Sequence, residues 1–168
     1  EITSYNFSDM ANNIGKFTAV GVELETASSA MQGIANWAGL AGQKAQSASR
    51  AMYNISQAMS AGYMKQQDWA SIQNANMDTK EFRETAYKTA KELAEAGKYT
   101  ELSLEWFDKN TYNDFFADLG KNKNFTTDVL IETLKKFSFY SDEIRRITED
   151  ENKTTIKAMD ILGEISED

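Results

Sequence analysis

The strongest local signal in the chain comes from residues 78–97, which read DTKEFRETAYKTAKELAEAG. Asp78-Thr79-Lys80-Glu81 resembles a capping box, in which a Thr hydroxyl and an acidic side chain bind the free backbone amides at the start of a helix. Apolar side chains then recur at helical spacing, at Phe82, Ala86, Ala90 and Leu93. The stretch predicts an amphipathic helix that ends near Gly97 and buries one face.

Two further helix starts follow toward the C-terminus. Thr111 with Asp114 predicts a short aromatic helix, for which Gly120 would be the C-terminal cap. A Thr at 126 or 127 predicts another helix, which ends near residue 139 and has an apolar face of Leu130, Leu134 and Phe137. From Ser141 onward, the spacing of Ile and Leu residues fits one long or two short helices.

The fold class follows from these signals and from two absences. The chain contains no proline, so no helix is broken by a missing amide, and no turn signal joins alternating strands. We therefore expect an all-α fold of several short to medium helices packed as a helical bundle, with no sheet.

Composition divides the chain into two helical regions. Residues 1–97 are rich in Ala, Gly and Ser, with residues 30–82 as their core, whereas residues 98–168 are acidic and amphipathic. In the first region one helix face is predicted from spacing alone, through Met10, Ile14, Phe17, Val20 and Leu24. Glycines interrupt this region, which favours closely packed helices; a membrane-active segment is the alternative.

Composition also limits the chemistry. The 168 residues contain no His and no Cys, which rules out Ser-His-Asp and Cys-His nucleophiles, disulfides and the usual zinc ligand sets within this chain. A formal net charge of -8 argues against a nucleic-acid surface, because phosphate binding needs clustered Lys and Arg. Carboxylates are plentiful, but Glu92, Glu95 and the acidic residues 149–151 fit solvated helix faces better than a glycosidase pair. We expect no catalytic residue, cofactor or metal.

Three separated phrases carry a resemblance to a known family. The longest is residues 49–82, and its most characteristic residues are Arg50, Tyr53, Gln57, Gly62, Asp68, Trp69, Ile72 and Phe82. Residues 33–39, GIANWAG, precede it, and residues 124–134 with NFTTDVL follow it. In this order, the phrases resemble the tape measure domain of long-tailed phages and Gram-positive prophages.

This resemblance implies a structural and assembly role rather than an enzyme. Tape measure proteins set tail length, occupy the tail tube and leave it during DNA ejection. The implied partners are tail tube and tail assembly proteins, including assembly chaperones, and other copies of the chain itself. The implied site of synthesis is the host cytoplasm, and the implied final location is the lumen of the tail tube. No direct nucleic-acid binding is expected of this segment, although the parent protein could contact a membrane during ejection.

Within the longest phrase, the pattern predicts a helix that buries one face, a stop at Gly62 and a short helix that presents Trp69 and Ile72. Tyr53, Trp69 and Phe82 are expected to anchor this helix-turn-helix unit, and Asp68 to cap the short helix. Trp37, Trp106 and the Met residues are expected in the core, with ligand stacking and a partner groove as the alternatives.

Two other functions remain open. Abundant amphipathic helices suit a generic protein-interaction or scaffold module. Trp37-Ala38-Gly39 also spells the turn tripeptide of small secreted helical-hairpin proteins of the WXG type, although no Tyr-x-x-x-Asp/Glu tail follows it.

Overall fold

The computed structural model describes residues 7–139, and in this part of the chain there are nine helices and no strand. They are α1 (Phe7–Ala19), α2 (Leu24–Leu40), α3 (Ala45–Ala61), α4 (Gln66–Asn74), α5 (Lys80–Glu95), α6 (Leu104–Lys109), α7 (Tyr112–Ala117), α8 (Leu119–Asn122) and α9 (Thr127–Ser138). The predicted all-α bundle is confirmed. The helices predicted beyond Ser141 lie outside the described residues.

The predicted helix in residues 78–97 is α5, but its N-cap is Thr79 alone and the predicted capping box of Asp78 and Glu81 does not form. The Thr79 hydroxyl accepts a hydrogen bond from the Phe82 amide at 3.2 Å. After Glu95 the chain reverses at Gly97, whose φ of +75° suits a residue without Cβ, and the Lys98 amide donates to the Leu93 carbonyl at 2.8 Å. Local capping therefore defines both ends of α5.

The two later helix starts are also confirmed, but one predicted stop is wrong. Thr111 and Asp114 form the capping box of α7, and the Thr126 hydroxyl accepts from the Val129 amide at the start of α9. Gly120, however, does not cap the aromatic helix. α7 ends at Ala117, and Gly120 lies inside the short α8, whose left-handed C-cap is Lys123 (φ 52°). The stretch predicted as one helix ending at Gly120 therefore forms two, because the short α8 begins at Leu119.

The apolar face predicted from Met10 to Leu24 is wrong in its second half. α1 ends at Ala19, and Gly21, with φ +96°, turns the chain into α2. Phe17 is fully buried, whereas Val20 is 36% and Leu24 65% exposed. The break at Gly21 changes the direction of the chain, so residues at helical spacing on either side of it no longer share a face.

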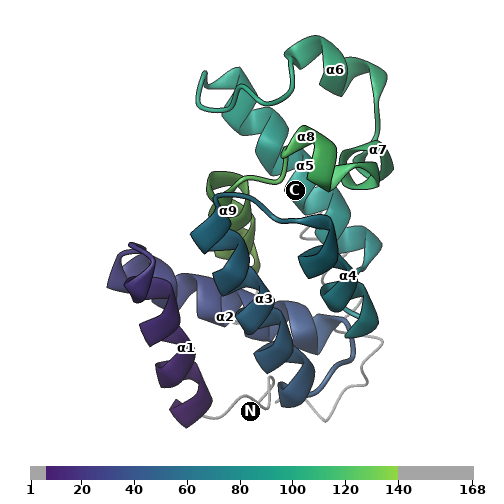
Figure 1. Cartoon of the computed structure of the whole chain (residues 1–168). Helices are drawn as coiled ribbons and strands as arrows, with labels where there is room; N and C mark the ends of the chain where they lie inside the picture. The colour runs from purple at the N-terminus through teal and green to yellow at the C-terminus, as the bar shows by residue number, and fades with distance from the viewer. Residues whose placement is uncertain (1–6, 140–168) are drawn as a thin grey trace.

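Helix α2 lies at the centre of one end of the molecule, between α1, α3 and α9 (Figure 1). From Ala30 to Leu40 every residue except Gln32 and Gly39 is buried, so the helix contacts neighbours on all sides. α6, α7 and α8 lie at the other end (Figure 1). No helix in the described part of the chain is long and apolar enough to cross a membrane.

The closest helix contact joins α2 to α9. A Cβ added at Gly33 would lie 2.0 Å from the Leu134 carbonyl oxygen, so only glycine permits this separation. One turn further on, the Asn36 side-chain amide donates to the Phe137 carbonyl at 2.9 Å. The contacts advance in the same direction along both helices, which therefore run parallel. This contact agrees with the expectation of close packing in the Gly-rich region.

The glycine at this contact provides a stability test with a matched control. Gly33→Ala should lower the free energy of unfolding by about 1–3 kcal/mol or more, because the added methyl group forces α2 and α9 apart. Gly15→Ala, in α1 with nothing within 4 Å of the added Cβ, should instead raise it by up to about 1 kcal/mol. Urea unfolding of both variants measures the difference. Equal effects of the two substitutions would contradict the close α2–α9 contact.

Candidate functional site

An aromatic core joins the three phrases. Trp37 stacks on Phe82 with ring centroids 3.8 Å apart and planes 9° from parallel. The indole N–H of Trp37 also donates to the Met77 carbonyl at 2.7 Å. From the third phrase, the Phe125 ring lies 6.2 Å from that of Phe82. Residues from all three parts of the sequence thus meet around one ring.

Trp69 and Ile72 are fully buried on α4, as predicted. The Trp69 ring contacts Phe116 at 4.7 Å, Phe82 at 5.9 Å and Phe125 at 6.4 Å between centroids. Its indole N–H is buried and has no acceptor among the described residues. The ring contributes to stability through its contacts with these three rings.

Arg83 of α5 links the loop between α4 and α5 to α7 beside this core. Its Nε and Nη2 atoms bind the two Asp78 carboxylate oxygens, each at 2.6 Å, and Nη1 binds Asn113 Oδ1 at 3.2 Å. The guanidinium also lies over the Phe116 ring, 5.1 Å from its centroid. The hydrogen bond to Asp78 raises the pKa of Arg83 above its ordinary value.

The sequence pattern did not predict this Arg83–Asp78 pair, which we call the clamp. It assigned Asp78 to the capping box, whereas the carboxylate lies outside the helix and turns toward Arg83. The two residues are five apart and flank the N-cap, so the usual i,i+4 rule for helix pairs does not find them. An Asp before a Thr N-cap with an Arg in the first helical turn is the only signal present.

The prediction that Tyr53 anchors the packed helix-turn-helix unit is wrong. It is 52% exposed, while α3 buries Ala51, Met52, Ile55, Ala58 and Met59. Arg50 and Gln57 are exposed with Tyr53 on the other face of the helix. The Gln57 side-chain amide donates to the Tyr53 hydroxyl at 2.7 Å, and Lys16 Nζ lies 5.5 Å from the centre of the Tyr53 ring.

Gly62 and Asp68 define the turn between α3 and α4. Gly62 is the C-cap of α3 with φ +94°, so the predicted stop is confirmed. The N-cap of α4 is Lys65 rather than Asp68, which occupies the third helical position. Burial raises the pKa of the Asp68 carboxyl; the charge of Lys65 and a hydrogen bond from its backbone act in the opposite direction. Asp68 thus supports the helix start from inside the first turn.

The remaining residues singled out from the sequence are mostly packed. Trp37 is buried and Trp106 is half-buried. Five of the Met residues lie in the core: Met31, Met52, Met59, Met64 and Met77. Trp37-Ala38-Gly39 falls in the last turns of α2, and the chain turns only afterwards, at Gly42 with φ +77°.

The acidic residues considered for catalysis do not cluster. Glu92 and Glu95 are exposed, and Glu92 pairs with Lys136 of α9 at 2.6 Å. Among the described residues, no group of three or more acidic side chains could hold a metal ion. The acidic residues 149–151 lie outside the described part of the chain.

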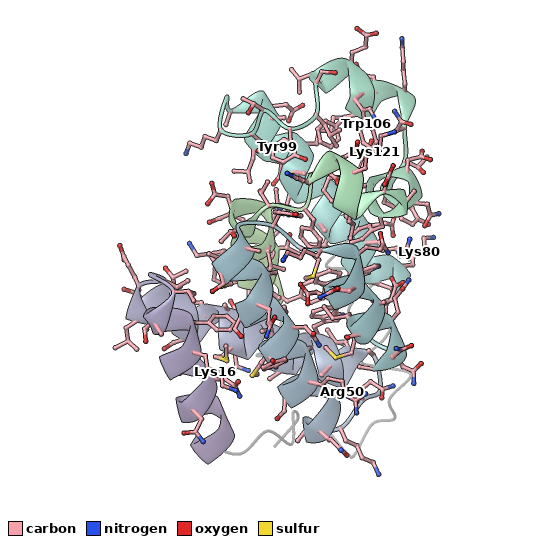
Figure 2. All side chains as sticks on the ribbon, in the orientation of Figure 1. Lys16, Arg50, Lys80, Tyr99, Trp106 and Lys121 are labelled. Atoms are coloured by element: carbon pink, nitrogen blue, oxygen red, sulfur yellow. The ribbon has the colours of Figure 1, made fainter. Side chains whose placement is uncertain are left out.

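A groove of about 430 Å³ opens beside the exposed face of α3. It is lined by Lys16 and Val20 of α1, by Ser56, Gln57, Ser60 and Ala61 of α3, and by Lys65. Figure 2 places Lys16 on α1 and Arg50 on α3 at the end of the molecule opposite Trp106. The lining of the groove includes two lysines and no carboxylate, although the chain has a formal charge of -8.

Comparison of the chain with protein-family models, curated proteins and solved structures finds no match. The resemblance to tape measure proteins therefore stays a prediction from the three phrases of the sequence. The longest of them divides into a buried set, with Trp69, Ile72 and Phe82, and an exposed set, with Arg50, Tyr53 and Gln57. The first set can act only through the fold, and the second is available to a partner.

This division predicts opposite effects for two aromatic substitutions. Trp69→Ala should lower the free energy of unfolding by about 3–5 kcal/mol, because it leaves a cavity among three rings. Tyr53→Ala should change it by about 1 kcal/mol or less, since it removes only an exposed ring and its contact with Lys16. Chemical denaturation monitored by circular dichroism measures both. A Trp69 variant as stable as the parent would contradict the described core.

Proposed function

We propose that this chain is a folded module of a phage or prophage tail tape measure protein, with a structural and assembly role. The observation that supports this most is the convergence of the three tape-measure-like phrases on Trp37, Phe82 and Phe125. Phrases that are about 90 residues apart in sequence form one core, as expected if they are parts of a single inherited unit.

Within the proposed parent protein, this module differs from the length-measuring part. A straight helix rises about 1.5 Å per residue, so 168 residues would extend about 250 Å. The described residues form short helices packed on each other instead. We assign the measuring role to other helical stretches of the parent and an assembly role to this module.

The exposed set of the longest phrase is the proposed contact surface. Arg50, Tyr53 and Gln57 contribute to the packing of α3 only slightly, yet the side chains of Tyr53 and Gln57 are held by a hydrogen bond. An ordered Tyr and Arg on a helix surface suit protein recognition, because both residue types are enriched at interfaces. Tail tube and tail assembly proteins, including chaperones, are the proposed partners, during synthesis in the host and inside the tube.

Deletions in the parent phage test the proposal. Removing residues 49–82 should abolish normal tails, because the deletion destroys the aromatic core and with it the module. The matched control removes 34 residues from a long helical stretch elsewhere in the parent, which should shorten otherwise functional tails by about 50 Å. Electron microscopy of both particles measures tail length and yield.

Either of two outcomes would contradict the proposal. If the control deletion leaves tail length unchanged, the parent is not a ruler, and a generic helical scaffold becomes the better assignment. If the deletion of residues 49–82 gives normal tails shortened in proportion, the segment is part of the ruler and not an assembly module.

A further inference from the structure

The groove between α1 and α3 carries positive charge on an acidic protein. Lys16 and Lys65 line it and are exposed, while the Ser56, Ser60 and Gln57 side chains supply further hydrogen-bonding groups. The charge of Lys65 also acts on Asp68, three residues further on, which is buried and does not line the groove. The Lys16 ammonium lies 5.5 Å from the centre of the Tyr53 ring, and among residues 7–139 it forms no ion pair with a carboxylate.

The groove also has an apolar rim. Val20 and Ala61 line it, and Val20 is 36% exposed. A ligand that fits this surface has acidic groups for the lysines and a few apolar side chains for the rim.

We propose that this groove binds residues 160–168 of the same chain, which read DILGEISED. This segment contains four acidic residues and no Lys or Arg. Its three large apolar residues, Ile161, Leu162 and Ile165, are spaced so that they share one face if the segment becomes helical on binding. The proposal concerns the chain's own charges and does not depend on the tail-assembly role.

The other acidic stretch beyond the described residues fits the groove less well. Residues 149–151 carry three acidic side chains, but the polar sequence Asn152-Lys153-Thr154 follows them directly. Ile144 and Ile147 precede them, but Arg145, Arg146 and Lys153 on the two sides would be repelled by the groove lysines. This stretch therefore serves as the matched control for residues 160–168.

The connecting chain is long enough for the contact. Twenty residues separate Phe139 from Asp160, and in extended form they span about 65 Å. A domain of the size described here has a radius of gyration of about 14 Å. The segment can reach the groove from the end of α9 whatever path it takes, and binding within one chain adds a high effective concentration.

Paramagnetic broadening in NMR tests the contact directly. Because the chain has no Cys, a single nitroxide label can be attached through Ser166→Cys. Amide signals of residues 16–20 and 56–61 should lose most of their intensity, while those near Trp106 keep theirs. Raising the salt from 0.1 M to 1 M should restore the signals, since the Debye length falls from about 10 Å to about 3 Å.

Charge variants separate this contact from chance proximity. Lys16→Glu combined with Lys65→Glu should abolish the broadening, whereas Lys98→Glu, at an exposed position that does not line the groove, should leave it unchanged. Neutralising Asp160, Glu164 and Glu167 should also abolish it, and neutralising the acidic residues 149–151 should not. Circular dichroism of each variant verifies the helix content; the acidic variants change no described residue.

Three outcomes would overturn the proposal. One is the absence of broadening at the groove. Another is broadening that survives both the lysine reversal and the neutralisation of the acidic segment. The third is broadening that appears only between chains, when a spin-labelled unenriched protein is mixed with an unlabelled ¹⁵N-enriched one, which would assign the groove to a second copy.

Discussion

The close parallel contact between α2 and α9 is the constraint on which the rest of the fold depends. Gly33 allows the two backbones to touch, and Asn36 binds the carbonyl of Phe137, which lies 101 residues away in the chain. With α9 in place, α2 is enclosed by α1, α3 and α9, and Trp37 is pressed against Phe82. Closing so long a loop costs conformational entropy, which the burial of the aromatic core must offset.

The sequence predicted features that depend on a few neighbouring residues. Thr79, Thr126 and the Thr111–Asp114 pair bind amides within three residues, and Gly62 ends α3 through its own backbone conformation. The errors concern longer-range choices. Tyr53 was placed in the core because it is aromatic, but the side of α3 that is buried depends on where α2 and α4 lie.

The same distinction explains what could be predicted of the candidate site. Trp69 and Ile72 follow from helical spacing, so their burial was predictable. The Arg83–Asp78 pair spans five residues around an N-cap, which the i,i+4 rule does not cover, and the groove beside α3 requires α1 and α3 to meet in the folded chain. A sequence motif thus contains some residues that pack in the core and others that face outward. Only the structure shows which residue belongs to which set.

The central claim is that α9 closes on α2 to make one cooperative unit, and native-state amide hydrogen exchange tests it most directly. Amides of Ala30–Leu40 and Val129–Phe137 should exchange with the same free energy of opening, equal to that of global unfolding measured with denaturant. If the α9 amides exchange through a local opening well below the global free energy while those of α2 stay protected, α9 is an accessory helix and the account is wrong.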